Sequence, residues 1–182
     1  NNPGRTYLSG KGLAYPVRLA GKEAQMLAQV REESNAQVEH MCEKLNAHLT
    51  ACGVDWQLSF SQIRNTLPMG SIRERHLAKA LRLAIDEHVE EGERGLFYER
   101  IFGGTPLKSD PGNIAAVENE IRSRLLKAGG AAFVPEDPKA FLPMEAVQRI
   151  IEAAGGLPTY PFLADDAKGG FTDFEGDLQK AA

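Results

Sequence analysis

The stretch GGAAFVPEDPKAFLPMEAVQRIIEAAGGLPTYPFL, residues 129–163, decides which fold the chain is predicted to adopt. It begins with a short apolar segment, AAFVP at 131–135, and closes with a second one, LPTYPFL at 157–163. Between them a helix is predicted to begin at Pro143 and to end at Gly155, because proline suits the first turn of a helix and glycine suits its end. A strand, a helix and a strand within about 30 residues form the βαβ unit of a parallel sheet or barrel. We therefore expect two parallel strands here.

The residues before this unit predict a series of helices. From about Lys22 to Ala51, apolar residues recur mostly three and four positions apart, which is typical of a long amphipathic helix. Ser71 and Glu74 form the S-x-x-E pattern of a capping box, so a second helix is predicted from Ser71 to about Glu91.

Three further helical segments are predicted, at 59–67, 94–102 and 110–128. The last of them has Asp110 as its predicted cap and proline at its first position. Five helical segments in a row indicate a helical subdomain. Before them, residues 5–19 predict one or two short strands.

Composition and charge restrict the class of protein. The chain has 182 residues, 42% of them hydrophobic, which is enough for one ordinary domain or a modest domain with a helical appendage. A formal net charge of -4 gives no global basic field, so nucleic acid is not an expected partner. No apolar run approaches the roughly 18 to 20 residues that span a bilayer, and we expect a cytoplasmic protein without membrane contact. Because the chain opens at Asn1 in a strand-like segment, we also expect it to be a piece of a longer protein.

The stretch LPMGSIRERHLAKAL, at 67–81, carries the clearest candidate binding residues. Two arginines in the first turn of a helix are unfavourable, because the helix N-terminus already bears a partial positive charge. An anion would relieve this, so Arg73, Arg75 and His76 are candidate ligands of a substrate phosphate. In the alternative interpretation, His76 lies at a packing surface and the arginines pair with Glu74 and other acidic residues.

Tyr160 and Asp165 are candidates for the lining of an active site. Tyr160 comes late in a predicted parallel strand, where barrel folds carry their functional residues, although a core tyrosine with a satisfied hydroxyl is the alternative. Asp165 opens an acidic loop whose spacing fits no calcium-binding template. The sequence contains no HxH, HExxH or paired CxxC motif, and no glycine-rich nucleotide loop, so these residues alone predict no metal ligand.

Three segments resemble a known family in order and spacing: GSIRERHLAKAL, GGAAFVP and MEAVQRIIEAAGGLPTYP. They are similar to the helical insertion and the following βαβ unit of the PHP (polymerase and histidinol phosphatase) superfamily. The resemblance implies a distorted (β/α)7 barrel that binds up to three divalent metal ions and hydrolyses phosphoesters. Tyr160 stands where the family often has a histidine ligand, and tyrosine is a poor ligand for zinc or manganese unless it loses its proton.

The implied fold is α/β and helix-rich, with a helical insertion subdomain plus a few parallel strands of a PHP-like (β/α)7 barrel. The resemblance implies three parts: a barrel strand segment at 1–21, the insertion at 22–128, and a barrel βαβ segment with a tail at 129–182.

The implied function is a segment of a metal-dependent phosphoesterase that acts on a small phosphoester or nucleotide-type substrate. Zn, Mn or Fe ions would be held mostly by residues outside this chain. Arg73, Arg75 and His76 would bind the substrate phosphate, and Tyr160 and Asp165 would line the active site. The alternative is a catalytically inactive PHP-derived binding or scaffold protein, which the tyrosine at 160 favours. An independent helical adaptor without a barrel is a third possibility.

Overall fold

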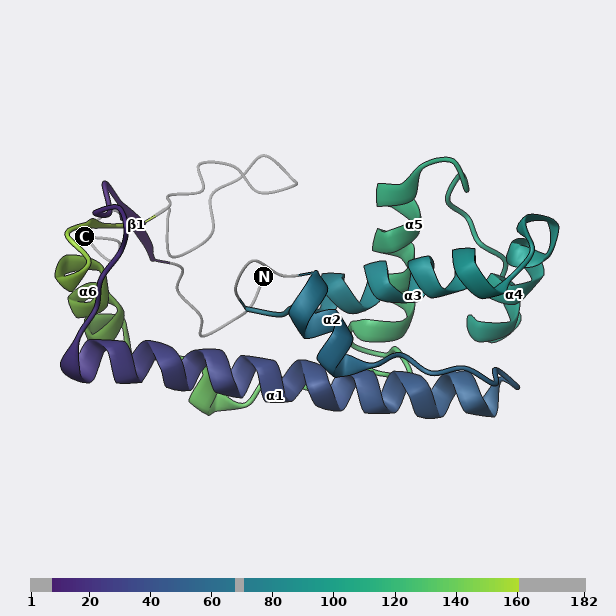
Figure 1. The fold of residues 1–182 in the computed structure, drawn as a ribbon, viewed down its shortest axis with the longest axis horizontal. Helices are drawn as coiled ribbons and strands as arrows, with labels where there is room; N and C mark the ends of the chain where they lie inside the picture. The colour runs from purple at the N-terminus through teal and green to yellow at the C-terminus, as the bar shows by residue number, and fades with distance from the viewer. Residues whose placement is uncertain (1–7, 68–70, 161–182) are drawn as a thin grey trace, which may run out of the picture. The chain divides into compact units, whose positions relative to one another are not determined.

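The computed structural model describes residues 8–67 and 71–160 (Figure 1). The chain divides into two compact units. The first combines the two ends of the chain, 1–28 and 142–182, and the second contains residues 29–141. The candidate site described below lies within the second unit.

The first unit is built on a two-stranded antiparallel ladder. Strand β1 (Ser9–Lys11) pairs with β2 (Leu157–Thr159), with Ser9 opposite Thr159 and Lys11 opposite Leu157. Helix α6 (Met144–Ala153) precedes β2, and Gly155 ends it with a φ of 75°. The helix predicted between Pro143 and Gly155 is therefore confirmed, as is a strand beginning at 157.

Glycine at position 156 fits the close packing in this unit. A Cβ there would lie 2.5 Å from Leu13 Cδ2 and 3.1 Å from Ile151 Cγ2. Gly10, across the ladder, meets the same two side chains at 3.0 and 3.1 Å. The ladder and α6 therefore approach each other closely through these two glycines.

The second unit is helical. Its core is formed by side chains that are almost completely shielded from solvent: Leu45, Leu49, Ile72, Leu77, Leu81, Ile85, Ile101, Ile121 and Leu126. The elements that supply or flank this core are α1 (Gly21–Ala51, from residue 29), α2 (Phe60–Thr66), α3 (Glu74–His88), η1 (Glu91–Glu93), α4 (Arg94–Ile101), α5 (Ile114–Ile121), η2 (Arg122–Leu126) and η3 (Pro138–Ala140). Each of the five predicted helical segments contains a helix, and in Figure 1 α5 lies across α3.

No helix of the described residues is long and apolar enough to cross a bilayer. The insertion boundaries 22–128 stay a prediction.

Side chains of α1 hold the connection to α2. The side-chain amide of Asn46 donates to Leu58 O at 2.9 Å, and its carbonyl accepts from Leu58 N at 2.9 Å. Ser59 follows at once and caps α2 by accepting from Gln62 N, as the sequence predicted. A single asparagine thus fixes the entry into α2 through both groups of its amide.

The predicted capping box at Ser71 is wrong. Helix α3 begins at Glu74, with Arg73 in extended conformation at the cap position, and it ends at His88. The cause is tertiary, since Ile72 N donates to Asn35 Oδ1 on α1 at 3.3 Å. The side chain of Ile72 is buried in the hydrophobic core, and the chain turns into the helix only after it.

The predicted cap at Asp110 is also wrong. Asn113 caps α5 by accepting from Ala116 N at 3.1 Å, whereas Asp110 closes the preceding turn. Beyond Ile121 the helix widens into a single π-helical turn, η2, which closes with a bond from Lys127 N to Arg122 O.

The strand predicted at 131–135 is not formed, and with it the parallel pair is wrong. The carbonyl of Phe133 accepts from Lys44 Nζ at 2.7 Å, and that of Val134 accepts from Gln37 Nε2 at 2.9 Å. These carbonyls are satisfied by side chains of α1, so the segment runs along a helix instead of joining a strand ladder. In the described residues, the two strands are antiparallel.

An aromatic stack closes one end of the second unit. The ring of Trp56 stacks on His88, with ring centroids 5.3 Å apart, and on Phe97, at 5.9 Å. The guanidinium of Arg100 lies 4.9 Å from the Phe97 centroid. The stack joins the segment after α1 to the end of α3 and to α4.

Candidate anion-binding site at the start of helix α3

The start of α3 is anchored on α1 by Arg73. Its Nη1 donates to Ser34 Oγ at 2.5 Å, next to the bond that joins Ile72 to Asn35. Ser34 and Asn35 are both buried on α1. The structure therefore gives Arg73 a positioning role, and phosphate binding by this side chain stays a prediction.

His76 replaces the glutamate of a normal capping box. Its Nδ1 accepts a hydrogen bond from Arg73 N at 2.9 Å, which satisfies one of the free N–H groups at the helix start. Since Nδ1 is an acceptor, the neutral ring carries its proton on Nε2. The imidazole is therefore held in one tautomer with a donor at its far side.

The pKa of His76 is lowered from 6.5. Partial burial is the largest cause, followed by the positive charges of Arg75 and Lys79, while Glu74 acts in the opposite direction. Protonation would also break the bond from Arg73 N. The neutral ring is therefore the form that stabilises the fold.

Lowering the pH should reduce the free energy of unfolding, because it protonates His76. A histidine with a lowered pKa contributes stability above its ordinary value of 6.5, and this is lost as the pH falls through the lower folded value. His76→Gln keeps an acceptor at this position, so we expect its unfolding free energy to change less between about pH 7.5 and 5.5 than that of the natural chain. His76→Ala should lower the free energy of unfolding by about 1 kcal/mol at about pH 7.5.

Urea denaturation followed by circular dichroism measures these differences. The remaining three histidines are shared by all variants, so they cancel in the comparison. Equal pH dependence in the natural chain and His76→Gln would show that His76 does not act as the cap.

Arg75 projects from the first turn of α3 into solvent. It is exposed, and it makes no hydrogen bond or ion pair with any residue in the described part of the chain. The other acidic residue of this turn, Glu74, is used elsewhere. The predicted pairing of the arginines with Glu74 is therefore not seen for Arg75.

Glu74 connects α3 to the end of the α5 region. Its Oε1 lies 2.9 Å from Lys127 Nζ and 3.3 Å from Arg122 Nε. Burial alone would raise the pKa of Glu74, but the hydrogen bond from Lys127 and the charges of Lys127 and Arg122 outweigh it and lower the pKa. The carboxylate of Glu74 therefore forms ion pairs with two cations beside the candidate site.

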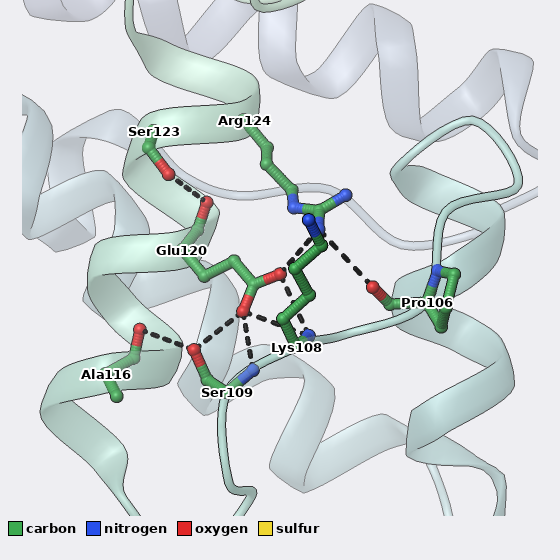
Figure 2. Close-up of polar contacts among 7 residues, drawn as sticks. All are labelled: Pro106, Lys108, Ser109, Ala116, Glu120, Ser123 and Arg124. Atoms are coloured by element: carbon green, nitrogen blue, oxygen red, sulfur yellow. Dashed lines mark hydrogen bonds and ion pairs between the residues drawn. The ribbon is translucent and has the colours of Figure 1, made fainter.

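Sequence reasoning missed a half-buried carboxylate, Glu120, on the same unit. Figure 2 shows that it accepts from Lys108 N, Ser109 N and Ser109 Oγ at distances of 3.0, 2.7 and 2.6 Å. Arg124 Nη2 lies 2.8 Å from its other oxygen. Burial alone would raise the pKa of Glu120, but these hydrogen bonds and the charge of Arg124 lower it. The spacing of four between Glu120 and Arg124 was the sequence signal for this cluster.

Of the other predicted site residues, Tyr160 belongs to the first unit, whereas α3 belongs to the second. Tyr160 directly follows β2 and is half-buried, and Asp165 lies outside the described residues. Within 8–67 and 71–160, no group of three or more His, Cys, Asp or Glu side chains could hold a metal ion.

Comparison with known proteins does not assign a family. No protein-family model, curated protein or solved structure gives a significant match to this chain. The resemblance to the PHP superfamily stays a prediction.

Proposed function

We propose that this chain is part of a metal-dependent phosphoesterase and that the start of α3 binds the phosphate of its small substrate. The observation that supports this most directly is a pair of donors without partners. Arg75 is exposed and unpaired within the described residues, and the Nε2–H of neutral His76 has no partner there either. The N-terminus of a 15-residue helix adds a partial positive charge.

In this proposal the residues of the chain bind and orient the substrate. Arg75 offers a guanidinium to two phosphoryl oxygens, and His76 donates from Nε2. Arg73 keeps the turn in place through Ser34. The metal ligands that the PHP resemblance implies would lie mostly outside this chain.

Steady-state kinetics of the complete natural protein with a small phosphomonoester tests this role. We expect Arg75→Ala to raise KM about tenfold, because a charge-assisted bond to phosphate is lost while the fold is kept. Arg64→Ala, which changes an exposed arginine of α2 without contacts in the described structure, should leave KM unchanged and is the matched control. Unchanged kcat and KM in Arg75→Ala, with an unchanged circular dichroism spectrum, would refute the role of α3.

The second candidate function is an inactive PHP-derived scaffold, and the observation that favours it is Tyr160 at the position of the expected histidine ligand. Elemental mass spectrometry of the complete protein separates the two. Two or more equivalents of zinc, manganese or iron favour the phosphoesterase. Protein that stays free of metal after incubation with these ions favours the scaffold.

A further inference from the structure

A hollow of about 530 Å³ opens beside α5 and η2, within the second unit. Polar and charged residues contribute to its lining together with Ala116: Ser109, Asn119, Glu120, Arg122, Ser123 and Lys127. Pockets that bind small molecules commonly have volumes of about 300 to 1,000 Å³. The hollow therefore has the size of a small-molecule site and a lining that suits a polar ligand.

The side chains at this hollow carry an excess of positive charge. Glu74 faces both Arg122 and Lys127, and Glu120 faces Arg124. Among the residues that line the hollow, two are cations, Arg122 and Lys127, and one is a carboxylate, Glu120, which leaves one positive charge. An anion can balance that charge without displacing Glu120 from the backbone groups that it accepts from.

Arg122 also has an unused donor. Its Nε is buried and makes no hydrogen bond in the described structure, because the 3.3 Å approach of Glu74 Oε1 lacks hydrogen-bond geometry. A buried donor without an acceptor is unfavourable by about 1 to 3 kcal/mol.

The π-helical turn brings the two cations together. In an α-helix, residues five apart point in directions about 140° different, so Arg122 and Lys127 would diverge. The π turn instead closes through Lys127 N and Arg122 O at 3.0 Å, and both side chains reach Glu74 Oε1. Such turns are rare and occur frequently at functional sites.

We propose that this hollow is a second site, distinct from the one formed by Arg75 and His76, and that it binds a small phosphate-type dianion through Arg122 and Lys127. Glu74 holds the two side chains in place and competes with the ligand for them. Asn119 also lines the hollow, and its Oδ1 accepts a hydrogen bond from Arg122 Nη1 at 3.2 Å. The site rests on this geometry and not on the phosphoesterase proposal.

Titration of the 182-residue chain with inorganic phosphate at constant ionic strength tests the proposal. Nitrogen–proton correlation NMR follows the Arg122 Nε–H and the Lys127 amide, and we expect saturable shifts with a midpoint in the millimolar range, about 4 kcal/mol of binding. Arg122→Gln and Lys127→Gln should each weaken binding about tenfold. Glu74→Gln should tighten it several-fold, because a competing carboxylate is removed.

Two controls separate this site from other effects. Lys139→Gln removes an exposed lysine of η3, and Arg75→Ala removes the cation proposed for the start of α3; both should leave the titration at Arg122 unchanged. The proposal is overturned if no saturable shift occurs up to about 50 mM phosphate. It is also overturned if Glu74→Gln fails to tighten binding, or if Arg75→Ala abolishes the shifts at Arg122.

Discussion

Replacing Glu120 with alanine should lower the free energy of unfolding by about 3 kcal/mol at neutral pH, as measured by urea denaturation. The side chain of Glu120 is 10% exposed and that of Arg124 is 21% exposed, so the pair is largely desolvated. Removing the carboxylate leaves Arg124 without its partner and two backbone N–H groups, of Lys108 and Ser109, without an acceptor (Figure 2). The connection that precedes α5 would lose its main attachment to that helix.

Glu43→Ala is the matched control, because Glu43 is exposed on α1 and should change the free energy by less than about 0.5 kcal/mol. The pH dependence gives a second readout. Because the pKa of Glu120 is lowered, its contribution is complete above 4.5 and is lost as the pH falls through the lower folded value. The difference between the natural chain and Glu120→Gln should therefore shrink between about pH 6 and pH 3. A constant difference over this range would contradict the role given to the ionised carboxylate.

Gly130→Ala is the second change with a large expected effect, a loss of about 2 to 3 kcal/mol. A Cβ at this position would lie 2.5 Å from both C and O of Leu125 and 2.7 Å from Arg124 O. These are backbone atoms of the π turn, so no side-chain rotation relieves the contact. Thermal and urea denaturation measure the loss.

Gly95→Ala provides a control with the opposite sign. Gly95 lies within α4, where an added Cβ meets nothing within 4 Å. Alanine should stabilise the helix there by about 0.5 to 1 kcal/mol. If Gly130→Ala is as stable as the natural chain, the π turn tolerates a side chain and the packing argument is wrong.

The local parts of the fold could be predicted because nearby residues determine them. Ser59 caps α2, and α6 lies between Pro143 and Gly155, as the residue types at those positions indicate. The predicted cap at Asp110 fails for a local reason, because Asn113, three residues later, caps α5 instead. Two other wrong predictions involve distant partners. The start of α3 depends on Asn35, 37 residues earlier, and the segment at 131–135 gives its carbonyls to Gln37 and Lys44. A pattern read over a few residues contains no information about such contacts.

The candidate site was predictable only in part for the same reason. Arg75 and His76 were found because charge at a helix start is a local signal. The separate role of Arg73 was hidden, since Ser34 lies on another helix. Arg122 and Lys127 were missed because a helical wheel with 3.6 residues per turn places them on different faces. No short sequence pattern predicts the π turn that follows Ile121.

Trp56 is the only tryptophan of the chain, and it lies in the second unit against His88 and Phe97. Its fluorescence is therefore an optical probe of residues 29–141 alone, whereas the far-ultraviolet circular dichroism signal sums the helices of both units. If the two signals give the same denaturation curve, the units unfold as one cooperative system. If the curves separate, the gap between their midpoints measures how independent the two units are, without any label or cut in the chain.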